Sequence, residues 1–139
     1  MKKTKSPIIG LLAMAGLVAT AMAETKVGIV EFEEKDAPGL SQRVRGTLAE
    51  TFRGENLGVV TPDGATIEDN GGAAKLARDL GVDWIVTGRV VGGKGITFIV
   101  AKAISKSGEV KGDALQIRDP SQMQGELKKL AKRLVEIME

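Results

Sequence analysis

Residues 76–90 read LARDLGVDWIVTGRV, from Leu76 to Val90, and join the end of a helix to the strongest strand of the chain. The helix is expected over 73–80, with Asp69 or Asn70 as its N-cap. Its apolar residues, which should face inward, are Ala73, Leu76, Ala77 and Leu80. Gly81 follows where the helix must stop, because glycine readily takes the left-handed conformation that ends helices. The pattern therefore predicts a short helix that leads directly into a strand.

The strand is expected over 82–91 and alternates between two faces. One face carries Val82, Trp84, Val86, Gly88 and Val90, and the other carries Asp83, Ile85, Thr87, Arg89 and Val91. Tight turns at 92–95 and 106–108 return the chain as two more strands, over 96–104 and 110–117. Gly112 and Asp113 indicate a bulge or a sheet edge in the last of these strands. Turns this short predict antiparallel pairing.

Upstream of this region, a β-α-β pattern is expected. A strand over 26–32 would place Val27, Ile29 and Glu31 on one side and Gly28, Val30 and Phe32 on the other. A helix from Pro38 and Gly39 to about Arg53 buries a stripe formed by Leu40, Val44, Leu48 and Phe52. Its solvated face carries Arg43, Arg45, Glu50 and Arg53, and Gly54 is the expected left-handed terminator. A brief strand over 57–61 follows.

The chain ends in a well-specified helix. Asp119 is a candidate N-cap, and Pro120 stands at the first helical position, where its missing N–H has no cost. An apolar stripe is formed by Met123, Leu127, Leu130, Leu134 and Ile137 or Met138. The element order is then β-α-β-α-β-β-β-α. This order predicts an α/β (mixed α+β) domain with a single mixed β-sheet of about five strands, packed by three helices.

The first 23 residues have the three parts of a secretory signal peptide. Lys2, Lys3 and Lys5 precede an apolar run over 8–18, and Ala21 to Ala23 place small residues at the positions that a signal peptidase recognises. The alternative is an uncleaved anchor, but residues 8–23 are shorter than the roughly 20 residues that span a bilayer as a helix. We therefore expect a signal peptide over 1–23, cleavage after Ala23, a periplasmic domain over 24–139, and no stable membrane anchor after cleavage.

Composition narrows the classes of function. Removal of three lysines with the signal peptide leaves 17 basic and 18 acidic side chains, so the mature domain lacks the basic surplus that nonspecific nucleic-acid binding requires. Cysteine, histidine and tyrosine are absent. Neither a disulfide nor a lipid-modified cysteine is possible, and the commonest general base and metal ligand is missing. We expect a protein that is not an enzyme, has no cofactor and does not bind nucleic acid.

Four stretches resemble the amino-terminal domain of TolB and its relatives. Two are the strand-like segments 26–32 and 57–61, the third is the junction 76–90, of the form LGVDxhhxGxV, and the fourth is the turn 105–110. Together they span nearly all of the mature chain. The same fold core occurs in the curli secretion channel subunit and in lipoproteins that activate penicillin-binding proteins. The resemblance implies a non-catalytic module for binding or assembly in the bacterial envelope.

Charged residues supply the candidate contact sites. The possible partner-binding residues are Glu33, Glu34, Asp36, Arg89, Lys128 and Lys132. The acidic cluster over 31–36 could also coordinate a divalent cation or act as an acid–base pair, although a solvated loop is the simpler interpretation. Gly92-Gly93-Lys94-Gly95 is not a phosphate loop, because Lys94 lacks the following Ser or Thr and a strand comes next.

The leading functional hypothesis is a non-enzymatic periplasmic adaptor that binds other envelope proteins during assembly, secretion or maintenance of the envelope. Its contacts would rest on surface complementarity or on strand addition at an open sheet edge. Two alternatives remain open at this point. One is a metal-assisted, carboxylate-dependent hydrolase, and the other is a structural subunit that self-assembles as a homo-oligomer.

Overall fold

One mixed β-sheet of six strands organises the chain, and the computed structural model describes it over residues 24–65 and 67–139. The predicted signal peptide 1–23 lies outside the described residues. The strand order is β4-β2-β5-β6-β7, and β3 also pairs with β5. The strands are β2 (Lys26–Ile29), β3 (Glu33–Lys35), β4 (Gly58–Val60), β5 (Trp84–Gly92), β6 (Thr97–Ser105) and β7 (Val110–Ile117). The predicted fold class is confirmed.

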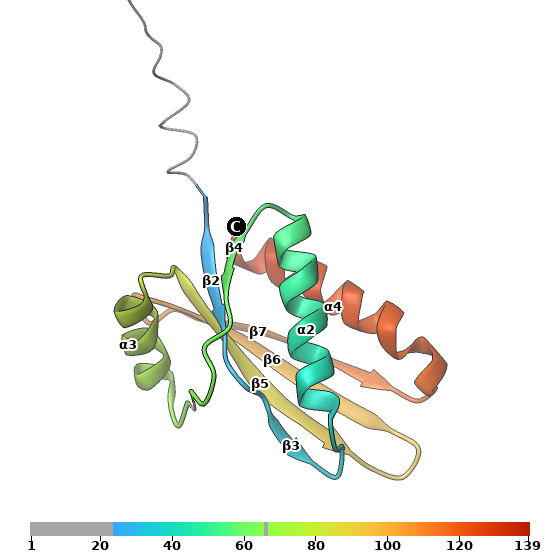
Figure 1. The fold of residues 1–139 in the computed structure, drawn as a ribbon. Coiled ribbons are helices and arrows are strands. Elements are labelled where there is room, and N and C mark those ends of the chain that lie inside the picture. Colours follow the sequence, from blue (N-terminus) through green and yellow to red (C-terminus); the bar gives the residue numbers. More distant parts are fainter. Residues whose placement is uncertain (1–23, 66) are drawn as a thin grey trace, which may run out of the picture.

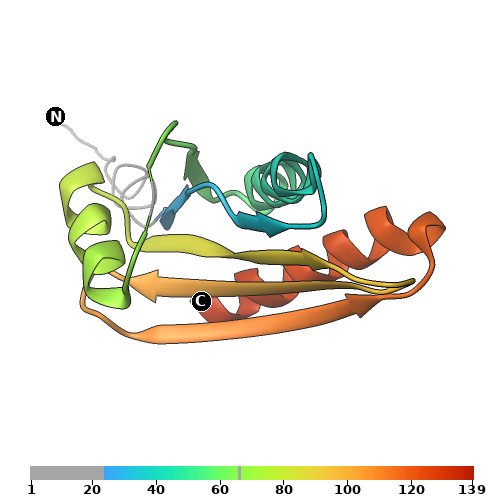
Figure 2. The same ribbon diagram turned by 90° about the horizontal axis from the view of Figure 1, so that it is seen from below.

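Three α-helices cover the sheet unequally. Helices α2 (Leu40–Gly54) and α4 (Met123–Met138) lie on one face, and α3 (Asn70–Leu80) lies on the other (Figure 1). A single 3₁₀ turn, η1 (Pro120–Gln122), precedes α4. Figure 2 shows β5, β6 and β7 running side by side, with α3 at one end of them. Within the described part of the chain, no helix combines the length and apolarity needed to cross a membrane.

The larger core lies between the sheet and the α2–α4 pair. Fully buried side chains from β2, α2 and α4 meet there, and the predicted stripes of both long helices supply Val44, Leu48, Phe52, Leu127, Leu130 and Leu134. The smaller core lies under α3 and contains Val30, Ala73, Ala74, Ala77, Val82, Ile85 and Ile104. Because α3 presents mainly alanine, it sits close to the sheet and covers little area.

Pairing directions follow the lengths of the connections. Strands β2, β4, β3 and β5 pair in parallel, whereas β5–β6 and β6–β7 are antiparallel hairpins. Helical crossovers are long enough for parallel pairing, and tight turns permit only antiparallel pairing. Gly95 and Gly108 adopt φ angles of 72° and 96° in the two hairpin turns. Both predicted hairpins are therefore confirmed.

Helix ends agree with the sequence at most positions. Asp69 accepts a hydrogen bond of 2.6 Å from the Gly72 N–H, and Gly81 has φ 72° at the end of α3. Asp119 accepts from the Ser121 N–H at 3.0 Å and so caps η1. One expectation is wrong, because α2 continues through Gly54 and Asn56 takes the left-handed conformation, with φ 66°.

Candidate binding surface

A one-residue bulge divides the predicted first strand into β2 and β3. Ile29 pairs with Val86 and Glu33 pairs with Arg89, so four steps along this strand match three along β5. The strand predicted over 26–32 therefore ends at Ile29. In the acidic segment 31–36, which was expected to be a loop, residues 33–35 form the strand β3. A bulge of this kind reverses which face each later side chain occupies.

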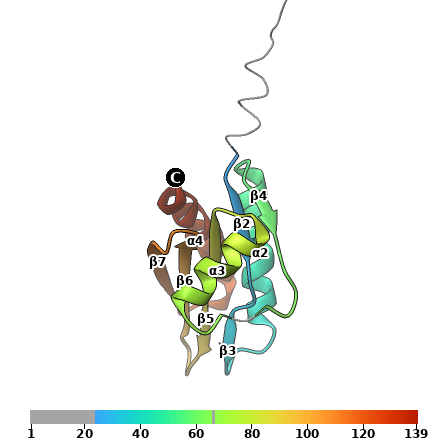
Figure 3. The same ribbon diagram turned by 90° about the vertical axis from the view of Figure 1, so that its left-hand side faces the viewer.

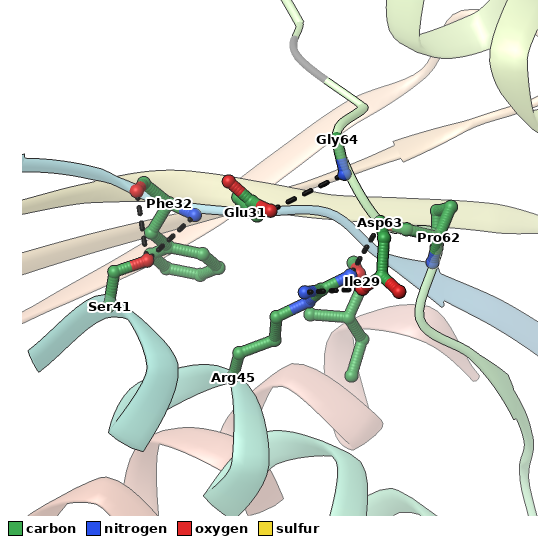
Figure 4. Close-up of polar contacts among 8 residues, drawn as sticks. All are labelled: Ile29, Glu31, Phe32, Ser41, Arg45, Pro62, Asp63 and Gly64. Atoms are coloured by element: carbon green, nitrogen blue, oxygen red, sulfur yellow. Dashed lines mark hydrogen bonds and ion pairs between the residues drawn. The ribbon is translucent and has the colours of Figure 1, made fainter. Parts of the chain in front are cut away.

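Two side chains of α2 hold this bulge (Figure 4). The Ser41 hydroxyl donates to the Phe32 carbonyl at 2.9 Å and accepts from the Phe32 N–H at 3.2 Å. Arg45 donates from Nε to the Ile29 carbonyl at 3.0 Å and from Nη2 to the Pro62 carbonyl at 2.6 Å. Arg45 was expected on the solvated face of its helix, but its side chain is only 13% exposed. The expectation was wrong because backbone carbonyls of two other segments, at Ile29 and Pro62, bind the guanidinium.

The bulge places Phe32 on the α2–α4 face, opposite to the face predicted for it. The ring lies over Gly88 of β5, where a Cβ atom would come within 2.8 Å of Phe32 Cε2 and 1.9 Å of the Val100 carbonyl oxygen. Only glycine fits at this position. The same shift brings Glu33 onto the α3 face beside Arg89, and the two form an ion pair with Nε and Oε1 3.6 Å apart.

Helix α3 covers only one end of its face of the sheet (Figure 3). It packs over Ile85 and Ile104, and its first residue, Asn70, accepts a hydrogen bond of 3.2 Å from Lys102 Nζ. Beyond Lys102, two rows of paired residues cross the sheet, and no helix within 24–65 or 67–139 lies above them. One row is Glu33, Arg89, Val100 and Ala114, and the other is Lys35, Val91, Phe98 and Gln116. We call these eight residues the open patch.

The open patch has three apolar side chains at its centre, Val91, Phe98 and Val100, with Arg89 beside them and most of its polar residues at its ends. Phe98 and Val100 are 45% and 44% exposed, although β6 is paired with a strand on each side. At one end of the patch, β3 contributes Glu33 and Lys35, and at the other end β7 contributes Gln116. An apolar centre with a polar rim is the usual composition of a protein contact surface. Isolated exposed apolar residues are common, but contiguous ones mark an interaction site more often.

A hollow of about 580 Å³ lies where the open patch meets the start of α3. Its floor includes Arg89, Val100 and Lys102, and its wall is the segment 67–70. The hollow therefore combines two cations with the carboxylates of Glu31, Glu33, Glu68 and Asp69. Several of these groups already have partners, since Glu33 pairs with Arg89 and Asp69 caps α3.

The predicted partner-binding residues do not form one site. Glu33 and Arg89 lie together in the open patch, as described above. Glu34 accepts a 2.7 Å hydrogen bond from the Ser41 N–H, and Asp36 lies in the bend after β3 with φ 55°. Lys128 and Lys132 are exposed on α4, which covers the opposite face of the sheet. Only Glu33 and Arg89 could therefore contact one ligand together at the open patch.

The acidic residues over 31–36 also have separate partners. Glu31 accepts from the Gly64 N–H at 3.4 Å, while Glu33 and Glu34 bond to different elements, as above. Among residues 24–65 and 67–139, no cluster of three or more acidic, cysteine or histidine side chains is arranged to hold a metal ion. The hydrolase alternative therefore has no three-ligand metal cluster among these residues, although Glu31 and Glu33 both line the hollow.

Phe98 and Val100 were missed by sequence reasoning. In the segment 97–104 both strand faces are largely apolar, a pattern typical of a strand buried on both sides. The one available signal was Lys102, which shares a face with Phe98 and Val100 and indicates that this face reaches solvent. A lysine two positions from the apolar pair is a weak signal, because long side chains can extend from a buried stem.

Strand β7 is an open edge of the sheet, as Gly112 and Asp113 indicated, but its centre is blocked. Asp113 Oδ1 accepts from the Ala114 N–H at 2.8 Å, and Oδ2 is bonded to Arg133 of α4. Burial alone would raise the pKa of Asp113, but the hydrogen bonds from Arg133 and Ala114 and the charge of Arg133 outweigh it and lower the pKa below its ordinary value. Occupied backbone groups and charged side chains discourage strand addition at an edge.

No protein-family model matches the sequence, and no curated protein matches it. Solved structures do match the fold. The PelC dodecamer from Paraburkholderia phytofirmans superposes with a TM-score of 0.58 at 14% identity, over 84% of this chain and 90% of that chain. Lipoprotein GNA1162 from Neisseria meningitidis gives a TM-score of 0.55 at 15% identity, over 81% and 96% of the two chains.

TolB from Acinetobacter baumannii matches with a TM-score of 0.50 at 13% identity, over 78% of this chain and 28% of that chain. The chain therefore has the fold that the four sequence stretches predicted, and shares it with PelC, with GNA1162 and with a part of TolB. Identities this low establish the fold alone.

Proposed function

We propose that the chain is a non-enzymatic periplasmic module that binds a protein surface through the open patch and serves in assembly, secretion or maintenance of the bacterial envelope. The observation that carries this proposal is the exposure of Phe98 and Val100 on an inner strand of a sheet whose other face packs against α2 and α4. Covering these two side chains removes apolar area from water, and the polar rim provides orientation.

Three further observations support the proposal. The signal-peptide pattern over 1–23 indicates export, and an exported domain of this fold would act in the cell envelope. The comparison structures are described as a lipoprotein, as TolB and, for PelC, as a dodecamer, so assembly is a property of at least one protein with this fold. The residue inventory, which lacks histidine and cysteine, is poor for catalysis but adequate for contact.

The test is photo-crosslinking in intact cells that express the full chain. A photoreactive amino acid replaces Phe98 in one variant and Glu50, an exposed residue of α2 on the other side of the sheet, in the control. We expect the Phe98 variant to give discrete crosslinked protein bands that the Glu50 variant lacks. Equal, background crosslinking from both positions would contradict the proposed function.

A further inference from the structure

We infer that the protein docked on the open patch is a second copy of this chain, in a two-fold, face-to-face pair. The inference rests on the proposed function, because it names the partner of the same surface. Two observations carry it. The first is the step in height between α3 and the uncovered sheet beside it, which we call the ledge. The second is the distribution of charge across the two rows of the patch.

The ledge has the depth of one layer of structure. Helix α3 begins at Asn70, beside Lys102, and no helix of the described residues covers the two rows on the far side of Asn70. A helix packed on a sheet and a second sheet packed on a sheet both stand about 10 Å above it. A second sheet laid on the open patch would therefore abut the start of α3 and continue the layer that α3 begins.

The position of α3 decides how the two copies can be related. With a two-fold axis parallel to the strands, the α3 helices of both copies would fall on the same place and collide. With the axis across the strands, between the two rows of the patch, each α3 lies beyond the β5–β6 hairpin of the other copy. Only this second arrangement lets each copy fill the ledge of the other.

The same axis makes the patch complementary to itself. It exchanges the two rows, so Lys35 of each copy comes opposite Glu33 of the other, and Phe98 comes opposite Val100. Glu33 is available for this contact, since its side chain is 76% exposed. The axis also brings Lys94, in the hairpin turn of one copy, toward Glu68 and Asp69 at the hollow of the other. Opposite charges therefore meet at the β3 side of the contact and at its two hairpin ends, while Arg89 comes opposite Val91 with Glu33 beside it.

Edge-to-edge pairing through β7 is less suited to a second copy. Asp113 already occupies the Ala114 N–H at the middle of that edge, as described above, and a neighbouring strand would have to displace it. The open patch has no comparable block. Because it comprises two rows on four strands, the contact lies at the small end of specific interfaces, and we expect a reversible pair whose population rises with concentration.

The first experiment is sedimentation velocity on protein recovered from the periplasm, across micromolar to millimolar concentrations. We expect a monomer–dimer equilibrium that Val100→Asp abolishes and Val60→Asp preserves. Val60 is a matched control, because it is 41% exposed on a strand at the far edge of the sheet. Circular dichroism of both variants establishes that they remain folded. A wild-type protein that stays monomeric throughout, or equal dimerisation by the two variants, would overturn the inference.

The second experiment tests the two-fold arrangement by charge exchange. Lys35→Glu and Glu33→Lys should each weaken the pair about tenfold, because each places like charges opposite one another twice. An equimolar mixture of the two variants should restore pairing as heterodimers, since every contact is then between opposite charges. A purely structural role for either residue predicts no rescue, and a mixture as weak as the separate variants would contradict the arrangement.

These results separate the inference from the proposed function. If the Phe98 photo-crosslink joins two copies of the chain, both stand. If it joins the chain to a different protein while the purified chain remains monomeric, the proposed function stands and the second copy is wrong. If Phe98 gives only the background seen from Glu50, the proposed function fails.

Discussion

Substitution of Ser41 by alanine tests whether α2 holds the bulge that shapes the binding surface. Ser41 is 7% exposed, and its hydroxyl bonds both the N–H and the carbonyl of Phe32. Loss of the hydroxyl leaves two backbone groups in a buried place, each at a cost of about 1–3 kcal/mol. We expect the free energy of unfolding to fall by about 2–4 kcal/mol, and the melting temperature to fall on the order of 10 °C.

Urea denaturation followed by circular dichroism measures the loss, and Gln42→Ala is its matched control. Gln42 is the next residue of α2 and is exposed, so its removal should change the stability by less than about 0.5 kcal/mol. Hydrogen exchange at the Phe32 amide localises the effect, because that N–H loses its acceptor in Ser41→Ala. Equal stability of the two variants, with unchanged exchange at Phe32, would refute the account of the bulge.

Three further predictions concern packing, charge and processing. Gly88→Ala should destabilise the fold by about 1–3 kcal/mol in urea denaturation, because its Cβ meets backbone, whereas Gly46→Ala on α2, with open space around it, should stabilise by up to about 1 kcal/mol. The pKa of Asp113 is lower in the folded chain, so its pair with Arg133 stabilises above about pH 4 and this contribution disappears as the pH falls through the lowered pKa. Asp113→Asn should therefore lower stability by about 0.5–1 kcal/mol at neutral pH and leave it nearly unchanged in strong acid, whereas a loss that does not vary with pH would contradict the role of the charge. Mass spectrometry of protein from the periplasm should find that the chain begins at Glu24, after cleavage behind Ala23. Recovery of the chain with residues 1–23 still attached would contradict the predicted signal peptide.

Local sequence patterns predicted most of the fold, because each of them reflects interactions between residues that are close in the sequence. The stripe on α4 follows from a helical period, and the hairpin turns follow from glycine at positive φ. The edge position of β7 was visible in Gly112 and Asp113, which suit a strand with one free side. Such features depend on neighbours within a few residues.

The candidate site was predicted less well because it depends on distant residues. The bulge between β2 and β3 is held by Ser41 and Arg45, which lie nine and 16 residues from the backbone groups they bond. Strict alternation from Val30 would place Phe32 on the wrong face, and no local pattern marks the extra residue. Arg45 looked solvated for the same reason, since the carbonyls that bind it belong to other elements.

By itself the sequence determined the element order, the buried faces of the helices, the tight turns and the pattern of an export signal, because periodicity, turn residues and leader composition act locally. Only the tertiary structure decided that α3 stops short of the end of the sheet and leaves Phe98 and Val100 uncovered. Burial of a strand face depends on whether another element reaches it, and that is a matter of how helices and strands pack in three dimensions. The apolar residues of β6 look the same in sequence whether or not a helix covers them.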